Sequence, residues 1–176
     1  MKKEEQIDAY MIRSYDLSDT SIIVVWYSLE LGVMKTVVKG AKAAKSTYAG
    51  RLEALSRYQV FFRRSRGDLH TLVDLEEVER YDEMRKSYDR FMLASYYCAL
   101  IEHWVVGDQD NEPIFRLLHR AITYCDQKAL EWRAVTYFEQ ELSKYLGYSV
   151  EPAEMRKLYQ APKLSKLRER IEQQIK

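Results

Sequence analysis

The sequence is poor in cysteine and has no long apolar run. Its 176 residues include two cysteines, Cys98 and Cys125, which lie far apart in apolar, helical-looking surroundings. This spacing argues against a disulfide framework and predicts buried free thiols in a reducing compartment, the cytoplasm. No apolar run approaches the roughly 18 residues that a membrane span needs. The N-terminal MKKEEQIDAY has no apolar core, so we expect neither a secretory signal nor a membrane partner.

Metal-binding and nucleotide-binding patterns are missing as well. The three histidines share no ligand spacing, and neither cysteine has a CxxC or CxxH neighbour. The acid-rich stretch 74–83 is typical of a solvated strand edge. The segment VVKGAKAAKST, residues 37–47, comes nearest to a phosphate-binding loop, but Lys45 stands where that loop needs its second glycine. We therefore expect no metal, no cofactor and no enzymatic site.

The pattern of apolar residues changes near residue 80. Five segments rich in β-branched and aromatic residues precede this point, and turn-forming residues separate them. Such short strands in about 70 residues predict a small closed barrel at residues 1–80. Apolar stripes of helical period follow it and predict an all-α domain at residues 81–176. The expected strands are 7–15, 20–28, 31–39, 57–64 and 69–77, and the expected helices are 85–106, one beginning near Pro113, 128–146 and 164–175.

Positive charge is concentrated in one short part of the barrel. The whole chain carries a net charge of +1, yet residues 35–66 hold nine basic residues and one acid, Glu53. This segment is therefore +8, and the rest of the chain is −7. A solvated face that balances an acidic body is one interpretation. A surface for the phosphates of a nucleic acid is the other, and we favour it because the cations are so concentrated.

The residues expected to contact nucleic acid come from the third strand, the link after it, and the end of the fourth strand. Lys35 and Lys39 are four residues apart on one strand and project from the same side. The link is Ala-rich, and we expect it to be flexible. Tyr27, Tyr48 and Tyr58 are candidates for stacking on bases, but for each of them we favour a place in the core or at the rim of the barrel. The expected site is Lys35, Lys39, Lys42, Lys45, Tyr48, Arg51, Arg63, Arg64 and Arg66.

Several motifs resemble those of the RecO family of bacterial recombination mediators. The matching motifs run from Arg13 and the turn Asp16-x-Ser18-Asp19 through K-G-A-K at residues 39–42 with K-S at 45–46. The resemblance continues through DRFMLASYYCALIE and FEQELSKYLGY, so that it covers residues 5–150. It implies an α+β protein with a five-stranded OB-fold barrel followed by an all-α helical domain.

The resemblance also implies a function. RecO proteins bind single- and double-stranded DNA, anneal complementary strands, and act with RecR and the single-strand DNA-binding protein, whose tail enters a pocket of the helical domain. By this resemblance the DNA contacts fall on Lys35, Lys39, Lys42 and Lys45. Many members of the family continue past L-G-Y with a cysteine-bearing segment and further helices. This chain has EPAEMRKLYQAPKLSKLRERIEQQIK there and lacks the zinc cysteines, so we expect a short form without zinc.

We therefore expect a non-enzymatic, monomeric protein of DNA repair and recombination, cytoplasmic and associated with the nucleoid. Its expected partners are DNA, a RecR-like protein and a single-strand DNA-binding protein. The alternative is a protein-interaction module of a repair complex with little DNA binding of its own. A nucleotide-dependent enzyme is a third and weaker alternative.

Overall fold

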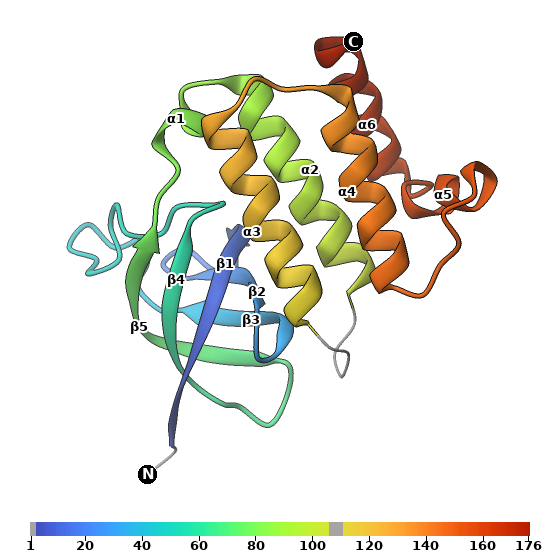
Figure 1. Cartoon of the computed structure of the whole chain (residues 1–176). Coiled ribbons are helices and arrows are strands. Elements are labelled where there is room, and N and C mark those ends of the chain that lie inside the picture. The colour runs from blue at the N-terminus through green and yellow to red at the C-terminus, as the bar shows by residue number, and fades with distance from the viewer. Residues whose placement is uncertain (1–2, 106–110) are drawn as a thin grey trace. The chain divides into compact units, whose positions relative to one another are not determined.

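The first part of the chain forms a closed β-barrel. The computed structural model describes residues 3–105 and 111–176 (Figure 1). Its strand order is β1-β2-β3-β5-β4, with β4 closing onto β1. All pairs are antiparallel except β3 with β5. This five-stranded barrel is the OB fold, as the sequence predicted. The strands are β1 (Glu4–Asp16), β2 (Ile22–Ser28), β3 (Gly32–Val38), β4 (Arg57–Arg63) and β5 (Leu69–Glu79).

The length of β1 allows the barrel to close. Its first half pairs with β4 and its second half with β2, and the register shifts between Met11 and Arg13. Such an irregularity bends a strand, which lets one strand belong to both sides of a small barrel. Trp26 and Tyr58 meet edge to face in the interior, with ring centroids 5.8 Å apart. Residues Ile23–Ser28 of β2 are all buried, in agreement with its apolar character on both faces.

Helices make up the second part of the chain. They are α1 (Asp82–Arg85), α2 (Tyr88–Trp104), α3 (Glu112–Gln127), α4 (Trp132–Tyr145), α5 (Pro152–Leu158) and α6 (Pro162–Ile175). The longest, α2, packs against α1, α3 and α6, which explains why it is apolar nearly all round. By its contacts the chain divides into two compact units, one within residues 1–80 that also includes Asn111, and one made of Tyr81–Val105 with Glu112–Lys176.

The helices differ from the sequence-based expectation in four places. Helix α4 begins at Trp132 rather than near Lys128, and α1 and α5 were not predicted. Tyr145 continues the apolar spacing of the helix expected at 128–146, but 43% of its surface is exposed. The buried positions of α4 run from Val135 to Ser143, and at about 100° per residue Tyr145 lies at the edge of this buried side, at the last residue of the helix. Val106, the expected end of α2, lies outside the described residues.

Candidate nucleic-acid interface

The outward positions of β3 carry two of the predicted cations. Met34 and Thr36 are buried in the barrel, so Lys35 between them points outward and is exposed. Thr36 accepts a hydrogen bond of 2.8 Å from Trp26 Nε1, which fixes this alternation. Lys39 follows the strand in the same alternation and is also exposed. Lys35 and Lys39 are therefore about 13 Å apart along one side of the sheet.

The strand pairing joins this side of β3 to β5 and β4. Lys35 pairs with Leu69 at the start of β5. Two residues later, Thr71 pairs with β3 on one side and with Arg63 of β4 on the other. Paired residues project to the same side of a sheet, and the strands that flank β5 are about 10 Å apart. Lys35 and Arg63 thus share one outward face, and Arg66 is exposed in the turn between β4 and β5.

The link between β3 and β4 is a series of turns rather than the flexible segment that was expected. Within residues 40–51, four amides donate to the carbonyl three residues earlier, at 3.0–3.3 Å. The amide of Lys42 donates to the carbonyl of Thr20 at 3.1 Å. The hydroxyl of Tyr48 donates to the carbonyl of Val73 in β5 at 2.9 Å. The link is therefore tied to the β1–β2 turn through Lys42 and to β5 through Tyr48.

The geometry of the link also bears on the nucleotide alternative. Gly40 has a φ of +68°, and the chain turns there at the end of β3. A phosphate-binding loop leads into a helix whose first amides face the phosphates. The next regular element after Lys45 is the strand β4. The segment VVKGAKAAKST therefore lacks the helix start as well as the second glycine.

The three candidate tyrosines do not offer free ring faces. Tyr27 and Tyr58 are completely buried, so for both the core interpretation is the correct one. Tyr48 is half-buried, and its ring packs against the barrel core. Burial raises the pKa of its phenol, with the carboxylate of Asp74 as a second cause. The groups of the candidate site that a nucleic acid can reach are therefore its charged side chains.

Four of the eight predicted cations are already ion-paired within the barrel unit. Their partners lie on β1 and β5, outside the segment whose charge was counted. The pairs are Lys42 with Asp16 at 3.0 Å, Arg51 with Asp74 at 2.9 Å, Arg63 with Glu4 at 2.6 Å and Arg64 with Glu5 at 2.8 Å. The register of β1 against β4 creates the Arg63 pair, because Glu4 lies directly opposite Arg63. The net charge of this surface is consequently less positive than the net charge counted along residues 35–66.

Two of these pairs change the acidity of their carboxyl groups. Hydrogen bonds from the guanidinium of Arg64 lower the pKa of Glu5. The amide of Leu75, and after it the side chain of Arg51, lower the pKa of Asp74. Both acids therefore stay ionised at neutral pH and neutralise their partners. Exposed pairs contribute only about 0–1 kcal/mol each, so a phosphate can displace these carboxylates.

The other four predicted cations are unpaired. Lys35, Lys39, Lys45 and Arg66 have no carboxylate within 4 Å in the described part of the chain. All four are exposed. These residues, called the barrel cations below, are the ones that can meet phosphates without first losing a partner. The sequence predicts these four residues but does not separate them from the four paired ones, because the acids of the pairs are distant in sequence.

The helical unit contains a pocket whose lining residues were not predicted from sequence. It has a volume of about 210 Å³ and lies among α2, α3 and α4. Buried side chains of Tyr97, Leu117 and Phe138 contribute to its apolar lining, and Arg120 and Tyr137 are among its polar groups. The pocket therefore suits an apolar group that carries a negative charge.

Metal-ligating side chains and reactive thiols would form other kinds of functional site among the described residues. Within residues 3–105 and 111–176, no three His, Cys, Asp or Glu side chains gather as metal ligands would. Burial raises the pKa of Cys98, and it raises that of Cys125 to about 12, so both thiols stay protonated at neutral pH. In the described part of the chain, no helix combines the length and apolar character that a bilayer crossing requires.

Comparison with protein families matches both units. The family model described as "Recombination protein O N terminal" matches residues 1–81, and "Recombination protein O C terminal" matches residues 85–153. Together they cover most of the chain. Residues 154–176, which include α6, lie beyond both.

Curated relatives give the same result. The DNA repair protein RecO of Pelotomaculum thermopropionicum is 30% identical over 141 residues, which are 80% of this chain and 54% of the relative. That of Syntrophus aciditrophicus is 25% identical over 143 residues, covering 81% and 55%. That of Rhodopirellula baltica is 28% identical over 143 residues, covering 80% and 53%. The chain thus spans about half the length of the curated relatives it matches.

Proposed function

Because this chain belongs to the RecO family, we propose that it acts in DNA repair and recombination by binding DNA on its barrel and promoting the annealing of complementary strands. The observation that carries this proposal is the set of unpaired barrel cations, Lys35, Lys39, Lys45 and Arg66. Exposed cations with no carboxylate neighbour bind a phosphate backbone of any sequence, in single or double strands.

The proposed mechanism needs no covalent chemistry. Two complementary strands repel each other because both are polyanions. Cations that neutralise their phosphates reduce this repulsion and release counterions, and the bases themselves then select the correct partner. The paired residues Lys42, Arg51, Arg63 and Arg64 join the contact by exchanging a carboxylate for a phosphate, while Tyr48 positions the link.

The protein acts as a non-enzymatic monomer at the nucleoid, with residues 1–80 as its DNA-binding domain and residues 81–176 as a helical domain for protein partners.

The pocket among α2, α3 and α4 supports the proposal that the helical unit binds a protein partner. Its apolar lining and the guanidinium of Arg120 fit the tail of a single-strand DNA-binding protein, the ligand that the family resemblance implies. Docking there would bring the barrel to DNA that is already single-stranded. The resemblance adds a RecR-like protein as a second partner.

Reversal of charge on three barrel cations tests the DNA-binding proposal. We expect Lys35→Glu, Lys39→Glu and Lys45→Glu together to weaken single-strand binding at least tenfold, because up to three phosphate contacts become repulsive. Fluorescence anisotropy with labelled single- and double-stranded oligonucleotides at two salt concentrations measures this. Far-UV circular dichroism checks that the exposed substitutions leave the fold intact.

The control carries the same change in total charge elsewhere. Lys86→Glu, Lys128→Glu and Lys144→Glu change three exposed lysines of the helical unit, and this variant is expected to bind nearly as the unchanged protein does. Equal binding by both variants would contradict the proposal. Absence of DNA binding by the unchanged protein would favour the interaction-module alternative.

A further inference from the structure

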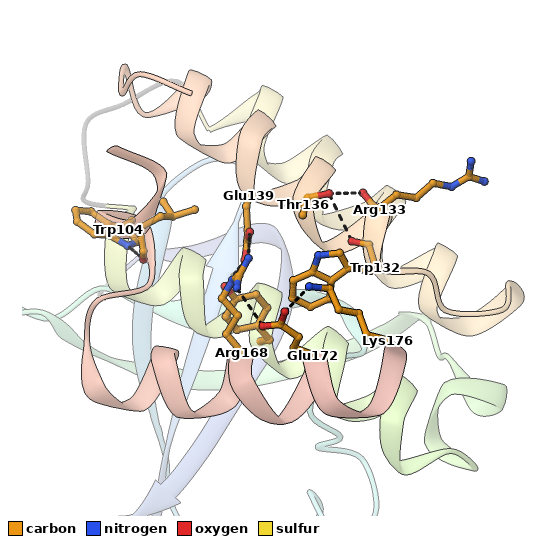
Figure 2. A network of polar contacts seen from close by, with 10 residues as sticks. Trp104, Trp132, Arg133, Thr136, Glu139, Arg168, Glu172 and Lys176 are labelled. Atoms are coloured by element: carbon orange, nitrogen blue, oxygen red, sulfur yellow. Dashed lines mark hydrogen bonds and ion pairs between the residues drawn. The ribbon is translucent and has the colours of Figure 1, made fainter. Parts of the chain in front are cut away.

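Helix α6 is held on the helical unit by a buried ion pair. Arg168 Nε lies 2.6 Å from Glu139 Oε1 in α4, and a terminal nitrogen of Arg168 lies 3.0 Å from Oε2 (Figure 2). Glu139 is only 2% exposed and also accepts a hydrogen bond of 2.6 Å from the hydroxyl of Tyr96. The guanidinium lies over the ring of Tyr159, 4.1 Å from its centroid. Arg168 therefore faces inward, and this contact fixes the rotation of α6.

Other contacts fix the same rotation. Leu164 and Ile171 are buried on the inward side of α6. At the end of the helix, Lys176 Nζ lies 4.7 Å from the ring centroid of Trp132 and pairs with Glu172 (Figure 2). The inward side of α6 is thus occupied by apolar and bonded groups, and its remaining side faces solvent in one defined orientation.

The side that faces solvent carries three cations in a row. Lys163, Lys166 and Arg170 are exposed, and in the described residues none of them has a carboxylate within 4 Å. At about 100° per residue they fall within an arc of about 60°, and they span about 10 Å along the axis. The exposed amides Gln173 and Gln174 flank this arc. We call Lys163, Lys166 and Arg170 the α6 row.

The acids of α6 lie on a different side of the helix. Glu169 accepts a hydrogen bond from Ser165 at 3.1 Å, and Glu172 is 3.8 Å from Arg168 and pairs with Lys176. By the same helical periodicity these residues fall more than about 60° from the centre of the α6 row. The row therefore has no carboxylate paired to it among the described residues, unlike four of the eight predicted cations of the barrel.

We propose that the α6 row is a second site for a nucleic-acid backbone, on the helical unit and separate in sequence from the barrel cations. This inference rests on the proposed DNA-binding function and extends it to residues beyond both family models. At about 3.4 Å of axial rise per phosphate along one strand, the row has room for about three phosphates. Cations that contact the phosphates alone would bind regardless of sequence.

A membrane surface fits the row less well than DNA does. Helices that bind in the plane of a membrane insert an apolar side among the lipids. The apolar residues Leu164 and Ile171 of α6 are buried in the helical unit, so no such side is exposed there. The α6 row would instead supply a second place for a strand, so that one molecule carries two cationic surfaces for the two strands that anneal.

The combined variant Lys163→Glu, Lys166→Glu and Arg170→Glu tests this proposal. We expect the annealing rate of complementary labelled oligonucleotides to fall at least tenfold, and the slope of log affinity against log salt to become shallower by about 2, since three phosphate contacts are lost. The variant Lys86→Glu, Lys128→Glu and Lys144→Glu serves as the charge-matched control. A neutral variant with glutamine at the three positions of the α6 row should show a smaller decrease in annealing rate. It keeps the test valid if the charge-reversed variant misfolds.

The outcomes separate this inference from the proposed function. If the α6 variant anneals and binds as the control does, while the unchanged protein binds DNA, the second site is disproved and the barrel site stands. If the unchanged protein binds no DNA, both proposals are overturned. If the α6 row proves necessary for binding to vesicles of anionic lipid but not for DNA, the assignment to nucleic acid is overturned.

Discussion

Arg64 and Lys45 carry the same charge and are both exposed, but their surroundings differ. Arg64 donates two hydrogen bonds of 2.8 Å to the carboxylate of Glu5. Lys45 has no carboxylate within reach among the described residues. A phosphate that approaches Arg64 must replace Glu5 and meets its repulsion, whereas Lys45 presents its whole charge. At the scale of single residues, the candidate site is defined by the cations that have no carboxylate partner among the described residues.

His70 provides a prediction at this scale. Its side chain is buried, stacks on Phe62 with centroids 5.4 Å apart, and accepts a hydrogen bond of 3.3 Å at Nδ1 from the amide of Ser65. Burial, and then the nearby charge of Arg64, lower the pKa of His70. Below a pH of about 6.5 the unfolded chain therefore binds more protons than the folded barrel, and the free energy of unfolding decreases as the pH falls.

Urea unfolding at a series of pH values measures this effect. We expect the urea concentration at the unfolding midpoint of the barrel to decrease as the pH is lowered from 7 to 5.5. His70→Asn keeps a hydrogen-bond acceptor but does not titrate, so its midpoint should change less over the same range. Parallel curves for the two proteins would show that His70 does not control this dependence.

At the scale of elements, the clearest unpredicted feature is the attachment of α6. The sequence predicted an amphipathic helix there, but it did not show that Glu139 and Arg168 are buried together. Charged residues are usually exposed, and a buried pair between α4 and α6 joins positions 29 residues apart. Proline in the interior of a helix bends or ends it, so Pro152 and Pro162 look like breaks in the sequence. Proline also suits the first turn of a helix, and α5 and α6 each begin at one.

The buried pair yields a stability prediction. Arg168→Met leaves the carboxylate of Glu139 buried without its cation, and loss of one partner of such a pair costs about 3–5 kcal/mol. We expect a decrease of this size in the unfolding free energy of the helical unit, measured by urea denaturation with circular dichroism at 222 nm.

A second substitution distinguishes the buried charge from the lost packing. Arg168→Met combined with Glu139→Gln removes the charge and keeps an acceptor for the hydroxyl of Tyr96. This double variant should regain most of the lost stability. A decrease below about 1 kcal/mol in Arg168→Met would mean that the pair does not hold α6 in place.

At the scale of the whole molecule, the sequence allowed the barrel and the helices after it to be predicted in the correct order. This worked because the apolar period changes from two to about 3.6 near residue 80, and because glycines and polar turns separate the strands. The charge of the surface could not be predicted in the same way. Asp74 and Glu4 meet Arg51 and Arg63 only after the barrel has closed, since strand register decides these neighbours.

The salt dependence of single-strand binding tests the central claim most directly. Four unpaired barrel cations that each neutralise one phosphate give a slope of log affinity against log salt of about −3. Contacts by the α6 row or by cations released from their carboxylates would make the slope steeper. We expect a slope of −3 or steeper for the unchanged protein, and a clearly shallower one after charge reversal at Lys35, Lys39 and Lys45. An affinity that does not change with salt, or a slope that these substitutions leave unaltered, would contradict DNA binding by the barrel cations.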